Sequence, residues 1–280
     1  MNPRILAPDW NDYELIDAGN SQKLERWGNV ITIRPENSAY FKPVLPFSDW
    51  LKKAHFRFHP KQGVFGEWES LSGKDLTWEI QYGSVRYRIQ LKNTKHTGVF
   101  PEQSNNWNFI EQVTEPGHTF LNLFGYSGAS SLIALSKGAQ VIHVDSSKSA
   151  LNWCQENLQT NGFEGCKLVH EDALQFISRE VKRGHKYDLI QMDPPAWGIG
   201  KNGKKWKLDL KIDELITTAA LILNPSGRML VSTYSPGIDG KLLSQIGKFS
   251  FPTKSIEIGM LSTQSRTNKI LEHGWMMKVF

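Results

Sequence analysis

Hydrophobic and polar positions change their spacing near residue 118. Before it, the segments TWEIQY and VRYRIQL alternate polar with apolar side chains on either side of Gly83-Ser84, a pattern that predicts a β-hairpin. After it, apolar runs of strand length alternate with longer helical patterns, which indicates a parallel sheet with crossover helices. We therefore expect a small β-rich domain over residues 1–92, a structured linker over 93–117 and an α/β domain over 118–280.

In residues 118–280, the pattern of apolar runs predicts seven strands joined by helices, with the last strand antiparallel. The strand sequences are TFLNLF, QVIHVD, CKLVHE, YDLIQMD, GRMLVST, SIEIGM and WMMKVF. The helices are expected over residues 129–136, 148–161, 173–182, 210–223 and 241–249. This order is typical of a Rossmann-like, doubly wound sheet, which binds ligands at the carboxyl ends of its strands.

The composition narrows the class of protein. Hydrophobic residues make up 39% and charged residues 22% of the chain, as in ordinary globular proteins. Because no apolar run approaches the roughly 18 to 20 residues of a membrane span, and the N-terminus has no signal-peptide pattern, we expect a cytoplasmic protein without a membrane partner. Two cysteines, Cys154 and Cys166, are too few for a disulfide framework or a four-cysteine site, and we expect no metal.

The charge favours a polyanionic partner. The formal net charge is +5 and the pI is near 9.0, a modest excess that many proteins share. Basic residues gather in KNGKKWK, which contains Lys201, Lys204, Lys205 and Lys207. This pattern suits contact with an RNA backbone, and a solvated surface loop is the alternative.

The segment LFGYSGASS, residues 123–131, follows an apolar strand and opens a helix. One interpretation is that Gly125 and Gly128 let a nucleotide-like ligand approach the backbone at the helix N-terminus. Such a site needs an acidic residue at the end of the second strand to bind ribose, and Asp145 stands there, 20 residues after Gly125. Since the turn lacks the glycine and lysine patterns of phosphate-binding loops, the better ligand is a nucleoside with an amino-acid tail, S-adenosylmethionine.

A second interpretation makes GYSGA a nucleophile elbow. Ser127, Asp193 and His273 would then follow the chain order of an α/β-hydrolase triad. Against it, Ala129 replaces the final glycine of that motif, and Asp145 is left without a role. A serine hydrolase using Ser127 therefore remains the alternative.

DPPAW, residues 193–197, follows the fourth apolar strand, which a doubly wound sheet places beside the first. Since proline lacks a backbone donor, the carbonyls of Asp193 and Pro194 can accept hydrogen bonds from a substrate amine or ring N–H. Trp197 is expected to stack on a flat base, with burial as a packing aromatic as the alternative. Asp172, in HEDAL, is expected to accept from an adenine amino group, and a helix N-cap role is compatible with this.

Together, LNLFGYSGASSLIALSKGA, VDSSKSALNWCQENLQTNG, HEDAL and DPPAW resemble the class I S-adenosylmethionine-dependent methyltransferases. More narrowly, KHTGVFPEQSNNW is similar to the K-x-T-G-x-[FY]-x-x-Q stretch of the bacterial 23S (large-subunit) ribosomal RNA methyltransferase family. The segment YELIDAGNSQKLERWG also resembles sequences ahead of such domains. The resemblance covers about residues 12–280, and its specific motifs lie between Lys95 and Trp197.

This resemblance implies a seven-stranded methyltransferase sheet, S-adenosylmethionine as cofactor and a linker that helps to close the cofactor pocket. The residues expected around the cofactor are Thr97, Phe100, Gln103, Phe124, Gly125, Tyr126, Gly128, Asp145, Ser146, Asp172, Ala173 and Asp193. The residues expected to face the methyl donor and the target are Asp193, Pro194, Pro195 and Trp197.

One branch of the family methylates carbon 5 of cytosine through a cysteine thiolate. The family places that cysteine after the fifth strand, where this chain has VSTYS, and neither Cys154 nor Cys166 reaches the site in the expected fold. We therefore expect direct in-line transfer to a base nitrogen of ribosomal RNA, such as guanine N7. A non-catalytic RNA-binding module that keeps the fold and a small-molecule acceptor stay open, as does the oligomeric state.

Overall fold

The chain folds into two units, each assembled from separate stretches of sequence. The computed structural model describes residues 3–199 and 205–280. One unit, here called the sheet unit, comprises Met1–Ile5, Asn106–Leu261 and Gly274–Phe280. The other, called the N-terminal unit, comprises Leu6–Asn105 and Ser262–His273.

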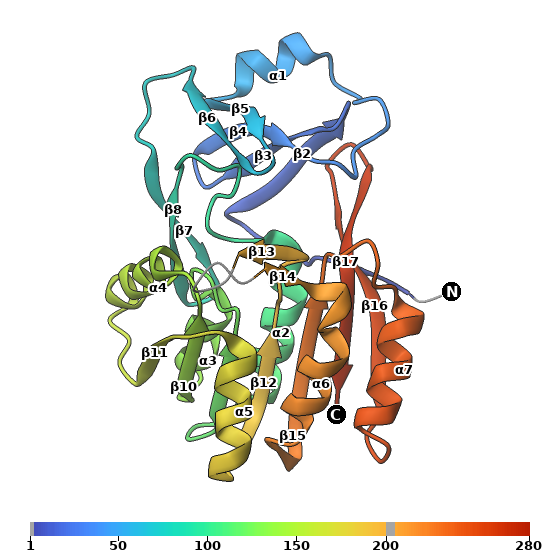
Figure 1. Cartoon of the computed structure of the whole chain (residues 1–280). Helices are drawn as coiled ribbons and strands as arrows, with labels where there is room; N and C mark the ends of the chain where they lie inside the picture. The colour runs from blue at the N-terminus through green and yellow to red at the C-terminus, as the bar shows by residue number, and fades with distance from the viewer. Residues whose placement is uncertain (1–2, 200–204) are drawn as a thin grey trace. The chain divides into compact units, whose positions relative to one another are not determined.

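An eight-stranded sheet forms the centre of the sheet unit, in the order β1-β16-β17-β15-β12-β9-β10-β11 (Figure 1). The strands from β15 to β11 in this order are parallel, and β17 is antiparallel to β15. The expected Rossmann-like α/β sheet with an antiparallel last strand is therefore confirmed. The bounds are β1 Arg4–Leu6, β9 Thr119–Leu123, β10 Gln140–Asp145, β11 Cys166–His170, β12 Tyr187–Met192, β15 Leu223–Thr233, β16 Ile256–Gln264 and β17 Ile270–Val279.

The count of seven strands was wrong for the described residues, because the N-terminal segment adds the edge strand β1. The amide of Met260 donates to the carbonyl of Pro3 (2.9 Å) and helps to hold this edge. A three-residue strand is too short for its alternation to be seen in the sequence.

Helices cover both faces of the sheet. In Figure 1, α5, α6 and α7 lie side by side in front of the sheet and α2 lies behind it. Aspartate or serine side chains cap α4, α5 and α7 by accepting a hydrogen bond from a first-turn amide, which explains why these helices begin close to their predicted positions. The bounds are α2 Ser104–Val113, α3 Ala129–Ser136, α4 Lys148–Asn161, α5 Ala173–Arg183, α6 Ile212–Ala220 and α7 Gly240–Ser250.

The predicted linker over residues 93–117 contains the helix α2, which the sequence did not reveal. Its first residues, Ser104, Asn105 and Asn106, compete with the backbone for hydrogen bonds and are typical of loops. Burial of Trp107 and Ile110 stabilises the helix instead. Tertiary packing has therefore overridden local propensity here.

The N-terminal unit contains a five-stranded sheet in the order β2-β3-β4-β5-β6, in which only the pair β4/β5 is parallel. The bounds are β2 Tyr13–Gly19, β3 Gln22–Trp27, β4 Val30–Pro35, α1 Phe47–Lys53, β5 Phe56–Gln62 and β6 Phe65–Ser70. The hairpin predicted around Gly83 is present as β7 (Thr77–Tyr82) and β8 (Val85–Gln90), which pair antiparallel. Gly83 has a φ of 56° in its turn, which suits glycine.

Residues 262–273 belong to the N-terminal unit, so the expected domain over 118–280 is not one unit. These residues form the tip of the hairpin between β16 and β17. Leu271, at this tip, packs in an apolar cluster with Leu15, Ala18 and Ala39. The tip therefore belongs to the N-terminal unit through packing between residues far apart in the sequence, which the periodicity of a strand cannot predict.

A buried ionic cluster in the N-terminal unit centres on Glu25 in β3. Its carboxylate accepts hydrogen bonds from Arg34 (3.0 Å to Nη2) and from the Tyr13 hydroxyl (2.8 Å), and the ammonium of Lys23 lies 3.3 Å away. Burial alone would raise the pKa of Glu25, but the charges of Arg34 and Lys23 outweigh it and lower the pKa to about 2. Ionised Glu25 therefore stabilises the folded unit at neutral pH.

We predict that Glu25→Gln lowers the free energy of unfolding by roughly 3–5 kcal/mol, because it leaves the buried Arg34 guanidinium without its carboxylate partner. Lys23 keeps its ion pair with Glu36 (3.1 Å) in this variant. Urea denaturation at neutral pH measures the change. The matched control is Glu79→Gln, which removes an exposed ion pair with Arg86 (3.5 Å). This control is expected to cost under about 1 kcal/mol.

The pH dependence of the free energy of unfolding tests whether the charge of Glu25 causes this stabilisation. The contribution of Glu25 is complete above its unfolded pKa of about 4.3 and is lost as the pH falls toward the folded pKa of about 2. The stability difference between the wild type and Glu25→Gln should therefore shrink across that interval. A difference that stays constant across it would contradict the electrostatic explanation.

Candidate functional site

A topological switch point lies at β9. Strand β10, which follows it in the chain, pairs with one side of β9, and β12, which comes later in the chain, pairs with the other side. Doubly wound sheets bind ligands at this point, outside the carboxyl ends of the strands. A cavity of about 110 Å³ opens there. Its lining residues are Phe124, Val144, Asp145, Ser146, Glu171, Asp172, Ala173, Pro195, Gly198 and Trp206.

The turn after β9 has an unusual backbone. Phe124 and Tyr126 have φ values of 57° and 53°, which side chains other than glycine seldom adopt without support. Strand β10 supplies that support, because the Gly125 amide donates to the Val144 carbonyl (3.1 Å) and the Tyr126 amide donates to Oδ2 of Asp145 (2.9 Å). The turn is therefore held in place by the end of the second strand.

Asp145 also holds the residue that precedes α4, because its Oδ1 accepts a hydrogen bond from the amide of Ser147 (2.8 Å). Burial raises the pKa of the Asp145 carboxyl, and the two amide hydrogen bonds oppose this shift. A carboxylate offers about four acceptor positions. Asp145 therefore keeps acceptor capacity for a ligand at the cavity wall.

The two glycines of the turn are required by packing within the protein. A Cβ atom at Gly125 would lie 2.2 Å from Cε1 of His143, and one at Gly128 would lie 2.4 Å from Sγ of Cys154. Gly128 also has a φ of 89°. The close approach of a ligand, which the sequence suggested for both positions, is therefore not needed to explain them.

A buried polar chain fixes the His143 ring beneath the turn. Asn122 Nδ2 donates to Ser131 Oγ (2.9 Å), and Ser131 Oγ lies 2.9 Å from His143 Nδ1. Burial lowers the pKa of His143 to about 4, so the ring is neutral at pH 7 and Nδ1 can accept from the Ser131 hydroxyl. The sequence did not single out any of these three residues.

Two acidic residues follow β11 at the cavity. Asp172 caps α5 by accepting from the amide of Gln175 (3.1 Å), and it also lines the cavity. The N-cap role is thus observed, and the position is compatible with the expected adenine contact. Glu171 lines the same wall and pairs with Arg179.

DPPAW leads into a hairpin that the sequence did not reveal, formed by β13 (Trp197–Ile199) and β14 (Lys205–Lys207). Trp197 pairs with Lys207 and is 67% exposed, so its alternative of burial as a packing aromatic is wrong. The cavity is instead lined by Trp206, whose ring centre lies 5.4 Å from that of Phe124 and whose Nε1 donates to the Pro195 carbonyl (2.7 Å).

Similar sequences come from methyltransferases. The family model described as Conserved hypothetical protein 95 matches residues 101–223. A Ribosomal RNA large subunit methyltransferase K/L from Syntrophotalea carbinolica is 32% identical over 177 residues, covering 61% of this chain and 24% of the relative. Another of the same name, from Pseudoalteromonas translucida, is 27% identical over 224 residues, covering 78% and 31%. The chain thus spans between a quarter and a third of these relatives' length.

Solved structures of methyltransferases share the fold of this chain. A SAM-dependent methyltransferase from Agrobacterium tumefaciens superposes with a TM-score of 0.91 at 29% identity, covering 100% of this chain and 96% of that one. The chain thus has the fold of S-adenosylmethionine-dependent methyltransferases and is similar in sequence to ribosomal RNA large subunit methyltransferases. A putative methyltransferase complexed with SAH shares the fold, with a TM-score of 0.74 at 16% identity over 98% of this chain and 76% of that one.

Within this methyltransferase fold, the residues expected at the site fall into four groups. Those that line the cavity are Phe124, Asp145, Ser146, Asp172, Ala173 and Pro195. Those that do not line it are Gly125, Tyr126, Gly128, Asp193, Pro194 and Trp197, together with Lys205 and Lys207 on β14. Thr97, Phe100 and Gln103 belong to the N-terminal unit, and Lys201 and Lys204 lie outside the described residues. Their roles toward a cofactor or RNA stay predictions.

The sequence did not single out four residues that line the cavity: Val144, Glu171, Gly198 and Trp206. Glu171 is adjacent to Asp172 after the third predicted strand, and this position could have indicated that it lies at the ligand-binding edge of the sheet. Trp206 lies between two lysines in KKWK, and this alternation is the pattern of a strand. Val144 carried no such signal, because it resembles any core strand residue.

Neither thiol nor Ser127 is placed to act as a nucleophile. Cys166 is the first residue of β11, whereas the cavity lies beyond the carboxyl end of that strand. Contact with Cys166, together with burial, raises the pKa of the Cys154 thiol, which disfavours the reactive thiolate. Ser127 is only 2% exposed, whereas an elbow serine has to be accessible. His273 belongs to the N-terminal unit and lies 2.8 Å from the Thr263 hydroxyl. These observations remove support for the hydrolase alternative.

Within residues 3–199 and 205–280, no helix is long and apolar enough to cross a membrane. In the same ranges, no group of three or more His, Cys, Asp or Glu side chains is arranged to hold a metal ion.

We predict that Gly125→Ala lowers the free energy of unfolding by roughly 1–3 kcal/mol, because the new methyl group overlaps the His143 ring. In a His143→Ala background, where the ring is absent, the same change should cost under about 1 kcal/mol. Urea denaturation of the four proteins of this cycle measures both values. An equal cost in both backgrounds would show that His143 does not impose the glycine.

Proposed function

We propose that this chain transfers the methyl group of S-adenosylmethionine to a base nitrogen of large-subunit ribosomal RNA. The observation that carries the proposal is the position of Asp145, which lines the cavity at the switch point and holds the turn after β9. The printed names of the relatives, which are ribosomal RNA large subunit methyltransferases, support the substrate. The neighbour solved with SAH supports the cofactor.

The donor set of the cavity fits this cofactor. Asp145 offers carboxylate oxygens for ribose hydroxyl groups, and Asp172 can accept from an adenine amino group, as can Glu171. Phe124 and Trp206 present aromatic surface to a flat base. The cavity, at about 110 Å³, is smaller than ligand pockets usually are, so we expect Trp206 to move off Phe124 when the cofactor binds.

The cofactor supplies an electrophilic methyl group, and the chain supplies position. Bound S-adenosylmethionine would give its methyl group to a nitrogen lone pair held in line with it: the N–C bond would form as the S–C bond breaks, and S-adenosylhomocysteine would leave. Holding donor and acceptor in this alignment would lower the barrier without a covalent enzyme intermediate. Such a step needs no thiolate, in agreement with the raised pKa of Cys154 and with the absence of cysteine from VSTYS, which spans the end of β15 and the two residues after it. We propose that the Asp193 and Pro194 carbonyls orient the base and that its acceptor atom is a ring nitrogen such as guanine N7.

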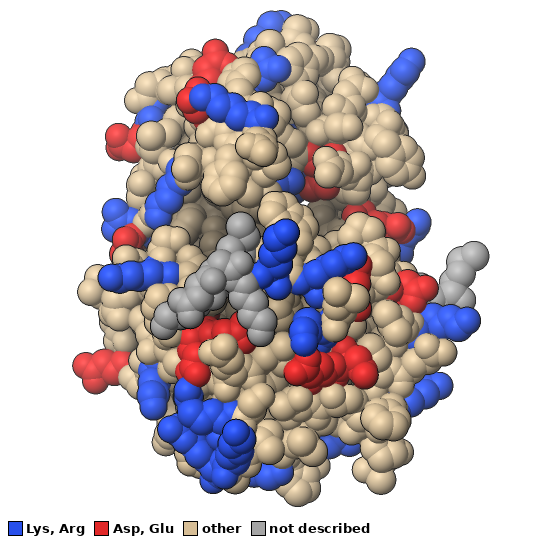
Figure 2. All heavy atoms as spheres, viewed as in Figure 1, with Lys and Arg blue, Asp and Glu red and all other residues tan. Residues whose placement is uncertain are grey.

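The hairpin beside the cavity is proposed to contact the RNA. Lys205 and Lys207 are exposed on β14, and Trp197 exposes most of its ring on β13. Figure 2 shows basic side chains close to acidic ones where Figure 1 draws this hairpin. RNA contact is therefore expected to be local, through lysine charges and stacking on Trp197.

Asp145→Ala is expected to weaken the binding of S-adenosylhomocysteine by about 10- to 100-fold, because it removes a charged hydrogen-bond acceptor. Isothermal titration calorimetry measures this. Asp239→Ala is the matched control, since Asp239 also accepts from a backbone amide (2.8 Å, Leu242) but caps α7 and does not line the cavity. Wild-type affinity in Asp145→Ala would refute this assignment of the cofactor site.

Replacing both Lys205 and Lys207 by alanine is expected to lower the slope of log affinity against log salt for ribosomal RNA by about two. Replacing Lys241 and Lys248, which are exposed on α7, removes the same charge and should leave the slope nearly unchanged. Fluorescence anisotropy measures the slopes. An unchanged slope in the first variant would exclude β14 from the RNA site.

Transfer itself is tested with tritiated S-adenosylmethionine and deproteinised large-subunit ribosomal RNA, followed by mass mapping of the modified nucleotide. A methylated base nitrogen supports the proposal. Binding of S-adenosylhomocysteine without transfer to RNA would favour a non-catalytic RNA-binding module or a small-molecule acceptor.

A further inference from the structure

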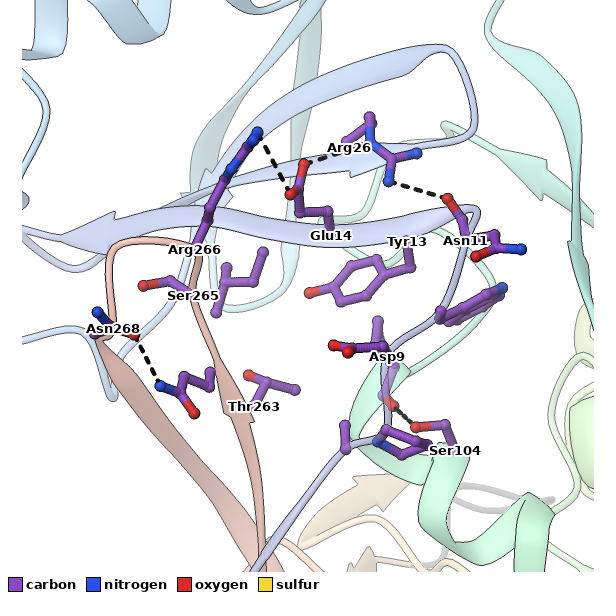
Figure 3. Close-up of a pocket in the computed structure, with 16 residues that line it drawn as sticks. Asp9, Asn11, Tyr13, Glu14, Arg26, Ser104, Thr263, Ser265, Arg266 and Asn268 are labelled. Atoms are coloured by element: carbon purple, nitrogen blue, oxygen red, sulfur yellow. Dashed lines mark hydrogen bonds and ion pairs between the residues drawn. The ribbon is translucent and has the colours of Figure 1, made fainter.

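The N-terminal unit contains a second and larger cavity, of about 510 Å³. All of its lining residues belong to this unit. They come from the segment before β2, from β2 and β3, from Pro101, from Ser104 at the start of α2, and from the tip between β16 and β17, as Figure 3 shows. The volume lies in the range of small-molecule and nucleotide sites, and nothing in the proposed methyl transfer uses it.

The cavity wall is fixed by hydrogen bonds to groups behind it. The Tyr13 hydroxyl donates to Glu25 of the buried ionic cluster (2.8 Å), and the Thr263 hydroxyl lies 2.8 Å from Nε2 of His273. Ser265 is held in its turn, because its hydroxyl accepts from the Lys269 amide (2.9 Å). A wall held in this way loses little conformational entropy when a ligand binds.

The interior and the rim differ in chemistry. In Figure 3, Tyr13, Asp9 and Thr263 face a common space, which is thus bordered by an aromatic ring, a carboxylate and a hydroxyl. These groups suit a flat heterocycle with amino or imino donors, since carboxylates accept from such groups on bases. Formal charges in the lining balance, because Asp9 and Glu14 offset Arg26 and Arg266.

At the rim, the carboxylate of Glu14 lies between two guanidinium groups. It is 3.5 Å from Nε of Arg26 and 3.7 Å from Nη1 of Arg266, whose side chain is 74% exposed. Exposed ion pairs of this length contribute little to stability. Arg266 can therefore turn to a phosphate, for which a guanidinium offers two parallel donors.

We propose that this cavity binds one unpaired nucleotide of the RNA substrate, with its base inside and its phosphate at Arg266. The size excludes a duplex, and proteins commonly recognise RNA through single bases turned out of the stack. The proposal rests on the RNA substrate of the proposed function. It gives the N-terminal unit a role in selecting the RNA that is separate from the cofactor site.

The test compares two substitutions with opposite expected effects. Arg266→Ala should weaken binding of a fluorescein-labelled, mixed-sequence single-stranded RNA by about tenfold, because it removes a charge-assisted hydrogen bond. Glu14→Gln should strengthen the same binding by about threefold, since it removes an anion that competes with the phosphate. The matched control is Lys53→Ala, which removes an exposed cation of α1 that does not line the cavity.

An RNA duplex of the same length separates base binding from simple charge attraction. We expect Arg266→Ala to affect the single strand and to leave duplex affinity within about twofold of wild type. Equal weakening for both RNAs, or none for the single strand, would overturn the proposal. Failure of Glu14→Gln to strengthen single-strand binding would overturn the phosphate assignment at the rim.

The same proteins are titrated with S-adenosylhomocysteine and assayed for methyl transfer. Wild-type protein that neither binds S-adenosylhomocysteine nor methylates RNA would refute the proposed function. Protein that does both, but whose RNA affinity is insensitive to Arg266→Ala, would refute only the nucleotide cavity.

Discussion

The hydrogen bond from the Tyr126 amide to the Asp145 carboxylate joins the turn after β9 to the end of β10, where the candidate ligand groups converge. It supports a turn in which two residues other than glycine have positive φ values. The same carboxylate accepts a hydrogen bond from the amide of Ser147, the residue before α4. Because burial raises the pKa of Asp145 while backbone amides oppose that shift, the group remains a strong acceptor beside the cavity. The proposed cofactor site depends on this one side chain more than on any glycine of the turn.

Sequence patterns were sufficient for features that depend on chain order. The five parallel strands, the antiparallel last strand and the acidic residue ending β10 all follow from periodicity and spacing. Features that depend on contacts across the fold could not be predicted. His143 appears as a strand residue in QVIHVD, and only the structure shows its ring where a Cβ of Gly125 would lie. Trp206 lies in a strand-like alternation with lysines, but only the structure, in which β13 pairs with β14, shows that it lines the cavity.

The two units use burial of polar groups in different ways. In the sheet unit, a neutral chain from Asn122 to His143 packs beneath the turn, and its low histidine pKa keeps it uncharged. In the N-terminal unit, Glu25 is buried as an ion, and its cost of desolvation is offset by Arg34 and Lys23. That ionic cluster also anchors Tyr13, one wall of the larger cavity. Stability and ligand recognition are therefore coupled in this unit through shared side chains.

The most direct test of the cofactor site is a crystal structure of the protein with S-adenosylhomocysteine. The account predicts ribose hydroxyls within hydrogen-bonding distance of Asp145, the adenine beside Asp172, and Trp206 displaced from Phe124. Ligand bound elsewhere on the chain, or ribose without a contact to Asp145, would contradict the account.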